Sequence, residues 1–283
     1  MSDVTHSGGY LTTKPEQFVK VFSLDALAAQ HIHGVLTDID DTLTCNGRIE
    51  PVALDALQRL HQAGVPVLAI TGRPAGWSEP FARVWPVLGI VAENGSVCLH
   101  KRDGALTKTY TQAASQRAEQ YARLQAVLHD IENRVPGAHR ARDSAGRETD
   151  IAIDHSEFHH LDAARIQQVL AMMHSAGLSA TVSSIHINGW FGAHNKYTGA
   201  CWALQALMGV DLPAEQDNWV FVGDSPNDQV MFQHLPLSVG VANILRFEGR
   251  LMHAPRWVTA SERGAGFAEV ANAVLAARAK DRS

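Results

Sequence analysis

Apolar residues along the chain gather in short runs that end at polar residues or glycine, and amphipathic segments separate these runs. Short apolar runs of this kind are typical of strands that are buried on both faces of a parallel sheet. They predict strands at residues 34–38, 65–70, 89–92, 219–222, 237–241 and 256–258. The remaining segments predict helices at residues 18–27, 51–63, 81–88, 197–207, 227–234 and 267–277. Because strands and helices alternate, the sequence predicts an α/β fold with a doubly wound parallel sheet.

The middle of the chain departs from this alternation. It predicts two helices, at residues 112–135 and 161–175, and two extended segments, at residues 149–153 and 179–187. This order predicts a smaller α+β domain that is inserted into the α/β core. The predicted division is a first core part at 1–100, an inserted cap domain at 101–187 and a second core part at 188–283.

Polar side chains follow three of the predicted core strands. Asp38 and Asp40 come at the end of the first strand, Thr71 follows the second, and Asp224 follows the strand at 219–222. Ligand sites of open parallel sheets lie at the carboxyl ends of the strands, so these side chains are expected near one ligand. Two carboxylates suit a nucleophile beside a proton donor, with a hard cation to offset their charge. The alternative is an Asp-rich turn, since such side chains also bond the local backbone.

Composition and charge narrow the function classes. The 283 residues and their 46% hydrophobic content support a sizeable core. The formal net charge of −5 gives no basic footprint for nucleic acid. The 15 histidines lack zinc-ligand spacing, and the 3 cysteines lie far apart, which fits a reducing compartment. Without an apolar stretch of about 18 residues or a signal-peptide pattern, we expect a cytoplasmic protein with no membrane partner.

Four short motifs follow one another on this framework. They are Asp-Ile-Asp-Asp-Thr at 38–42, Thr71 within 70–73, Lys196 after an asparagine, and Gly-Asp-Ser-Pro-Asn-Asp at 223–228. In this order they resemble the haloacid dehalogenase (HAD) superfamily on its phosphatase branch, which implies a Rossmann-like core. The predicted insert lies between the second and third motifs, where the class II caps of that superfamily are placed. The Glu-Asn-Gly at 93–95 is similar to the class IIB, Cof-type subfamily, which includes many sugar phosphatases.

The resemblance implies roles for the acidic residues. Asp38 would attack phosphorus and form an aspartyl-phosphate, while Asp40 would protonate the leaving oxygen and then activate water. The implied cofactor is Mg²⁺, which prefers hard oxygen donors. Its implied ligands are Asp38, the backbone carbonyl of Asp40, and Asp224. Asp228 would hold a metal-bound water or orient Lys196, and a helix-capping role explains it equally well.

Three further residues are expected to bind the phosphate group. Thr71 would use its hydroxyl, Gly72 its backbone N–H, and Lys196 its positive charge. Thr71 is also typical of a strand-end turn or a helix cap. Lys196 is also typical of an exposed lysine at a helix start, although a lysine there opposes the helix dipole, which a functional role would explain.

Candidate substrate residues lie before and within the predicted cap. Asn94 is expected to touch phosphate or the far end of the substrate, and a plain turn is an equal alternative. Asn188 is expected to contact substrate, together with Arg147, Asp150 and His186 as candidate readers of the leaving group. A solvated surface position is the alternative for each of them.

These observations predict a Mg²⁺-dependent phosphatase that hydrolyses small phosphorylated metabolites, sugar or polyol phosphates above all, through an aspartyl-phosphate. The phosphorylated small molecule is the expected partner, and the sequence leaves the oligomeric state open. One alternative is a phosphomutase of the same superfamily, which returns the phosphoryl group to a sugar. Another is a non-catalytic binding protein on this scaffold, which loss of Asp38, Asp40 or Lys196 would have indicated.

Overall fold

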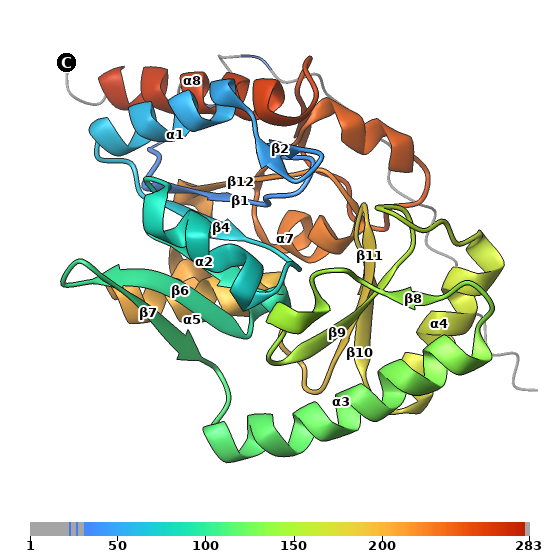
Figure 1. Cartoon of the computed structure of the whole chain (residues 1–283). Coiled ribbons are helices and arrows are strands. Elements are labelled where there is room, and N and C mark those ends of the chain that lie inside the picture. Colours follow the sequence, from blue (N-terminus) through green and yellow to red (C-terminus); the bar gives the residue numbers. More distant parts are fainter. Residues whose placement is uncertain (1–22, 24–26, 28–30, 281–283) are drawn as a thin grey trace, which may run out of the picture.

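The structure is a computed structural model that describes residues 23, 27 and 31–280. Within these residues, eight strands form the larger sheet in the order β14-β13-β12-β1-β4-β5-β6-β7 (Figure 1). They are β1 (Gly34–Thr37), β4 (Val67–Ile70), β5 (Gly89–Ala92), β6 (Val97–Arg102), β7 (Ala105–Tyr110), β12 (Trp219–Gly223), β13 (Leu237–Gly240) and β14 (Trp257–Val258). The six strands from β14 to β5 are parallel, while β6 and β7 are antiparallel additions at one edge.

Helices cover both faces of this sheet, which confirms the predicted doubly wound α/β core. The helices are α1 (Pro51–Gln62), α2 (Ala75–Val84), α5 (Lys196–Met208), α6 (Leu212–Glu215), α7 (Gln229–His234) and α8 (Arg263–Lys280). Successive residues of β1 show the division, because Val35 packs into the cluster with α1, α2 and α8, whereas Leu36 packs into the cluster with α5 and α7. Strand side chains alternate between faces, so one short buried strand supports both layers.

Local sequence explains the first of these helices. Pro51 occupies an early position of α1, where its missing N–H would have no partner within the helix. Buried Ala53, Leu57 and Leu60 recur at helical spacing and face the core. The chain leaves the helix at Gly64, whose φ of +71° favours glycine.

A second sheet of four described strands carries the middle of the chain, in the order β10-β11-β9-β8. Its elements are α3 (Ala114–Arg134), β8 (His139–Arg140), β9 (Asp150–Asp154), α4 (Ala163–Ser175), β10 (Ser179–Val182) and β11 (His186–Trp190). All its strand pairs are antiparallel, and α3 and α4 pack on one face (Figure 1). We call residues 114–190 the inserted unit. The boundaries at 101 and 187 stay a prediction, but β7 belongs to the larger sheet and β11 extends past residue 187.

Several elements differ from the predictions. The extended segment at 179–187 is two strands, because the Ser183 hydroxyl accepts from the amides of Ile185 and His186 and turns the chain. The helix expected at 81–88 is α2, which begins six residues earlier, at Ala75, and contains Pro80. The hairpin of β6 and β7 and the small hairpin of β2 (Thr44–Cys45) and β3 (Arg48–Ile49) were not predicted.

The helix predicted at 18–27 lies outside the described residues, apart from Ser23 and Leu27. Among the described helices, none combines the length and the apolar character that crossing a membrane would require.

Candidate active site

Three of the four predicted acidic residues come together beyond the carboxyl ends of β1 and β12. β12, β1 and β4 are neighbours in register, with Thr37 opposite Val222 on one side and Ala69 on the other. Asp38 follows directly, and its amide donates to the Val222 carbonyl at 2.9 Å. Single carboxylate oxygens of Asp38, Asp224 and Asp228 all lie within 4.8 Å of one another, and all three residues are buried. The strand-end argument therefore locates a real cluster.

Lys196 lies inside this cluster and not on the surface. Its Nζ donates to Asp38 Oδ1 at 2.5 Å and to Asp228 Oδ1 at 2.7 Å, and its side chain is 2% exposed. Burial alone would lower the pKa of Lys196, but the charges of Asp228 and Asp38 outweigh burial and raise it. The ammonium group is therefore fixed in its charged form beside the predicted nucleophile.

Backbone packing sets how far Lys196 reaches. It is the first residue of α5, and Asn195 caps that helix by accepting from the Thr198 amide at 3.0 Å. The first turn of α5 packs against η2 (Glu93–Gly95), where Gly199 and Gly95 approach so closely that neither position has room for a Cβ. The helix start, and the lysine with it, is thus fixed by a contact between two backbones.

Negative charge exceeds positive charge in the cluster. Burial raises the pKa of Asp38 to about 8, against the effect of Lys196, and the charges of Asp228 and Asp40 add to the rise. Burial, together with the charges of Asp38 and Asp228, raises the pKa of Asp224 as well. Three carboxylates beside one ammonium group leave a deficit of positive charge, which a divalent cation would offset.

The donor atoms fit Mg²⁺. Asp224 Oδ2 accepts from Asn243 Nδ2 at 3.1 Å, while Asp224 Oδ1 is buried without a hydrogen-bond partner. Asp228 is already engaged, because its Oδ1 accepts from Lys196 and its Oδ2 accepts from the amides of Asp224 and Ser225. Asp224, a member of the cluster, thus carries a hard oxygen donor that no protein group engages. The bonds of Asp228 favour the orienting and capping roles over direct metal binding.

The loop after β4 supplies the other predicted phosphate ligands. Thr71 is fully buried, and its Oγ1 accepts from the Arg73 amide at 3.0 Å, which leaves the hydroxyl proton free to donate. The turn role and the phosphate role of Thr71 are therefore compatible. A Cβ at Gly72 would lie 3.2 Å from Asn94 Oδ1 and 3.3 Å from Asn188 Oδ1, so both predicted substrate asparagines border this loop.

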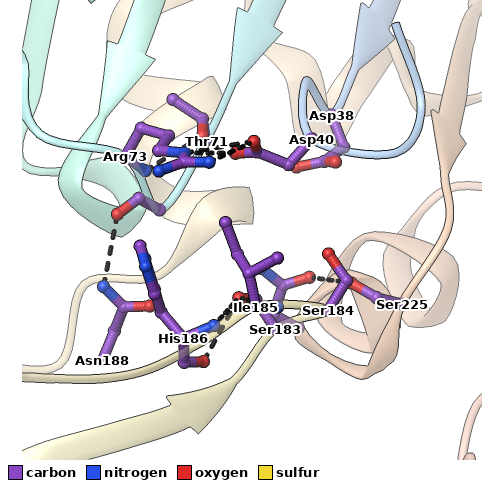
Figure 2. A pocket seen from close by; sticks show the side chains of 12 residues that line it. Asp38, Asp40, Thr71, Arg73, Ser183, Ser184, Ile185, His186, Asn188 and Ser225 are labelled. Carbon is purple, nitrogen blue, oxygen red and sulfur yellow. Dashed lines mark hydrogen bonds and ion pairs between the residues drawn. The ribbon is translucent and has the colours of Figure 1, made fainter. Parts of the chain in front are cut away.

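Asp40 lies apart from the cluster, in contact with Arg73. Arg73 Nε donates to both carboxylate oxygens of Asp40 at 3.1 Å, and Nη2 donates to Oδ1 at 3.0 Å (Figure 2). The same guanidinium reaches Asp143 and Glu157 of the inserted unit. Arg73, Asp143 and Glu157 were not predicted as site residues from the sequence. Arg73 follows the second motif directly, which is a signal, but nothing local pairs it with carboxylates some 70 to 84 positions away.

Strand periodicity explains which residues of the inserted unit face the core. Ile151, Ile153 and Ile187 pack under α3 and α4, so the alternate residues of β9 and β11 point the other way. That opposite face carries Asp150 and Asn188, both buried.

Three candidate substrate residues share one buried network. Arg147 Nη1 donates to Asp150 Oδ1 at 2.7 Å and to the Gly72 carbonyl at 3.0 Å. Asn188 Nδ2 donates to the same carbonyl at 3.2 Å and to Asp150 Oδ2 at 3.1 Å. His186 instead bonds Glu157 at 2.9 Å. None of these four is a solvated surface residue.

A buried carboxylate also joins the inserted unit to the core. Glu93 accepts from the amides of Ala75, Glu148 and Thr149 and from the Thr149 hydroxyl.

The site between the two sheets is a pocket at the strand ends of the core, and the turn between β10 and β11 forms its opposite side (Figure 2). Its lining residues are Asp38, Asp40, Thr71, Gly72, Arg73, Ser183, Ser184, Ile185, His186, Asn188, Ser225 and Asn227.

Comparisons with known proteins agree with this architecture. Residues 35–131 match a family model described as haloacid dehalogenase-like hydrolase. A phosphoglycolate phosphatase of Methanococcoides burtonii is 26% identical over 243 residues, covering 84% of this chain and 94% of that protein. A phosphoglycolate phosphatase of Methanosarcina acetivorans is 25% identical over 240 residues, covering 83% of this chain and 93% of that protein.

Solved structures share the fold. Protein 0175 of Thermoplasma acidophilum superposes with a TM-score of 0.67 at 16% identity, covering 87% of this chain and all (100%) of that one. The sucrose-phosphatase of Synechocystis, in complex with sucrose and phosphate, gives 0.61 at 16% identity, covering 85% and 96%. The C-terminal domain of Candida albicans trehalose-6-phosphate phosphatase gives 0.62 at 15% identity, covering 92% and 98%.

A doubly wound sheet with acidic strand ends, a buried lysine and an α+β unit above them defines a capped α/β phosphatase. Residues 35–131 match the haloacid dehalogenase-like hydrolase family and relatives named phosphatase match most of the chain, in agreement with the predicted Cof-type phosphatase of the haloacid dehalogenase superfamily. The predicted family and the predicted enzyme class are thereby confirmed. The alternative of a non-catalytic binding protein is set aside.

Proposed function

We propose that the protein is a Mg²⁺-dependent phosphatase of small sugar or polyol phosphates that acts through an aspartyl-phosphate on Asp38. The observation that carries the proposal is the convergence of Asp38, Lys196 and the orphaned oxygen of Asp224 at one sheet edge. Mg²⁺, held by Asp38, Asp224 and the backbone at Asp40, would act as a Lewis acid on the phosphoryl oxygens.

The first half-reaction forms the bond between an Asp38 carboxylate oxygen and phosphorus while the ester bond to the leaving oxygen breaks. Asp40 donates its proton to that leaving oxygen, so the product departs as a neutral alcohol. Lys196 supplies positive charge to the phosphoryl group and holds the Asp38 side chain in place. The Thr71 hydroxyl proton is free to bond a phosphoryl oxygen.

The second half-reaction reverses the role of Asp40. Its carboxylate takes a proton from water, the water oxygen bonds to phosphorus, and the acyl-phosphate bond breaks. Inorganic phosphate leaves, and Asp38 is regenerated as a carboxylate. The same side chain must therefore stay free of direct metal contact, which its contact with Arg73 supports.

Charge pairing supports a neutral leaving group. Among the described residues that line the pocket, Arg73 is the one arginine. Its guanidinium donors are already bonded to Asp40, Asp143 and Glu157. A carboxylate on the substrate, as in phosphoglycolate, would therefore find no pair of free guanidinium N–H donors in the pocket. The Ser184 hydroxyl, which also lines the pocket, instead suits a sugar or polyol hydroxyl.

The same pairing argues against the phosphomutase alternative. A mutase must also bind a phosphate group on the far side of the sugar, which requires cations that are free of internal partners. Arg147, the other buried guanidinium beside the pocket, is paired with Asp150 and Asp143.

The proposal is tested by phosphate release from a panel of phosphorylated metabolites, with Mg²⁺ and with EDTA. Release from sugar or polyol phosphates that EDTA abolishes is the expected result, with phosphoglycolate among the weaker substrates. The matched control is Asp38→Asn, which should remove turnover while the protein stays folded. Release that survives in Asp38→Asn, or release that is insensitive to EDTA, contradicts the proposal.

A further inference from the structure

One guanidinium group joins the proposed acid and base to the inserted unit. Besides Asp40, Arg73 donates from Nη2 to Glu157 Oε1 at 2.7 Å, and from Nη1 to Glu157 Oε2 at 3.2 Å and to Asp143 Oδ2 at 3.0 Å. The Arg73 side chain is 5% exposed. Three carboxylates, one from the core and two from the inserted unit, therefore meet at one buried side chain.

The geometry of arginine makes this contact directional. Its donors lie in one rigid plane, so fixing the edge that faces Glu157 and Asp143 also fixes the edge that faces Asp40. A lysine would carry the same charge as a point, without this coupling of directions.

The partners in the inserted unit are themselves held in place. Asp154, at the end of β9, accepts the amides of residues 156–159, which shapes the loop that carries Glu157. His186 bonds Glu157 Oε2 at 2.9 Å, and Arg147 Nη2 bonds Asp143 Oδ1 at 3.2 Å. The orientation of Arg73 is consequently set by a preorganised surface of the inserted unit.

We propose that Arg73 is a positioning residue that makes the placement of Asp40 depend on the docked position of the inserted unit. The inference rests on the proposed function, in which Asp40 exchanges protons with the leaving oxygen and with water. Arg73 does not contact the phosphoryl group in this proposal. It holds Asp40 at a fixed separation from Glu157, so that the acid is correctly placed only when loop 155–159 lies over the strand ends.

The first test compares leaving groups in Arg73→Lys. We expect the single-turnover rate with alkyl phosphates to fall about 100-fold, the size typical of a misplaced general acid. The burst of p-nitrophenol from p-nitrophenyl phosphate should stay within about threefold of the natural protein, because that leaving group needs no proton. An equal loss with both substrates would mean that Arg73 binds the phosphoryl group, which overturns the proposal.

Two further variants complete this test. Glu157→Gln weakens the inserted-unit side of the contact without touching Asp40, and we expect the same selective loss with alkyl phosphates. The double variant should be no slower than Arg73→Lys alone, because both changes break one linkage. Arg59→Lys is the matched control, since Arg59 pairs with Asp55 on the exposed face of α1 and does not line the pocket. Additive losses in the double variant would contradict the coupling.

A readout independent of catalysis separates this inference from the proposed function. Amide hydrogen exchange in residues 156–159 should become about tenfold faster in Arg73→Gln than in the natural protein, because the loop loses its tie to the core. Unchanged exchange overturns the inference, whatever the activity. If the natural protein releases no phosphate from any substrate, the proposed function fails, and the exchange experiment still decides whether Arg73 links Asp40 to the loop.

Discussion

Asp38→Asn should stabilise the metal-free protein as well as inactivate it. The pKa of Asp38 is raised to about 8, chiefly by burial, and Lys196 at 2.5 Å compensates only in part. An ionised carboxylate with a raised folded-state pKa costs stability, because folding then disfavours its charged form. Asparagine keeps the shape of the side chain and removes that charge.

The size of the effect follows from the shift. Between pH 3.8, the ordinary pKa of an aspartate side chain, and pH 8, the unfolded chain gives up the Asp38 proton and the folded chain retains it, so stability falls as pH rises through this window. pH 7 lies about three units above the lower end of this window. At 1.36 kcal/mol per unit, the raised pKa of Asp38 therefore lowers the free energy of unfolding by about 4 kcal/mol at pH 7. This figure already includes the attraction and the hydrogen bond of Lys196, which lower the pKa of Asp38. Asp38→Asn should therefore stabilise the folded, metal-free protein by at most about 4 kcal/mol.

Thermal unfolding of both proteins in EDTA and in Mg²⁺, at pH 5 and pH 8, measures this effect. In EDTA at pH 8, Asp38→Asn should melt several degrees above the natural protein, and the gap should shrink at pH 5. Mg²⁺ should raise the melting temperature of the natural protein more than that of the variant, because a cation offsets the charge that the variant lacks. A variant that melts at or below the natural protein in EDTA at pH 8 would refute this reasoning.

Three other variants probe the same site. Asn243→Leu removes the donor to Asp224 Oδ2 and should weaken Mg²⁺ binding, measured by titration calorimetry, about 10- to 100-fold. Asp40→Ala should slow both half-reactions, and rapid-quench kinetics should show that only the first recovers with p-nitrophenyl phosphate. Lys196→Met leaves Asp38 and Asp228 without their cation, so denaturant unfolding should show a loss of about 3–5 kcal/mol in the absence of metal. No loss of stability there would mean that the two carboxylates are not ionised together.

The core was predictable because its signals are local. Each parallel strand is a buried apolar run, and the polar residue after it falls at the same sheet edge as its neighbours. The edge hairpin of β6 and β7 escaped prediction because its side chains are partly exposed and mixed in character. The turn at Ser183 was missed because one hydroxyl makes it, without glycine or proline nearby.

Only the site residues that lie in the four sequence motifs could be predicted. Motif order located Asp38, Lys196 and Asp224, whereas Arg73 with Glu157, and Asn243 with Asp224, are pairs that long-range folding creates. The charge balance of the pocket depends on such pairs. The sequence alone could therefore not distinguish a pocket that binds a substrate carboxylate from one that binds substrate hydroxyls. The roles of the individual residues and the domain boundaries stay predictions.

The contact between Gly95 and Gly199 has a consequence for how variation in this chain should be interpreted. The position of the buried Lys196 depends on the absence of side chains at Gly95 and Gly199, and neither glycine lines the pocket. A conservative change such as Gly199→Ala would push the start of α5 away from the strand ends and carry Lys196 with it. We expect such a variant to keep every charged group of the site and still to lose phosphate release as a lysine deletion would.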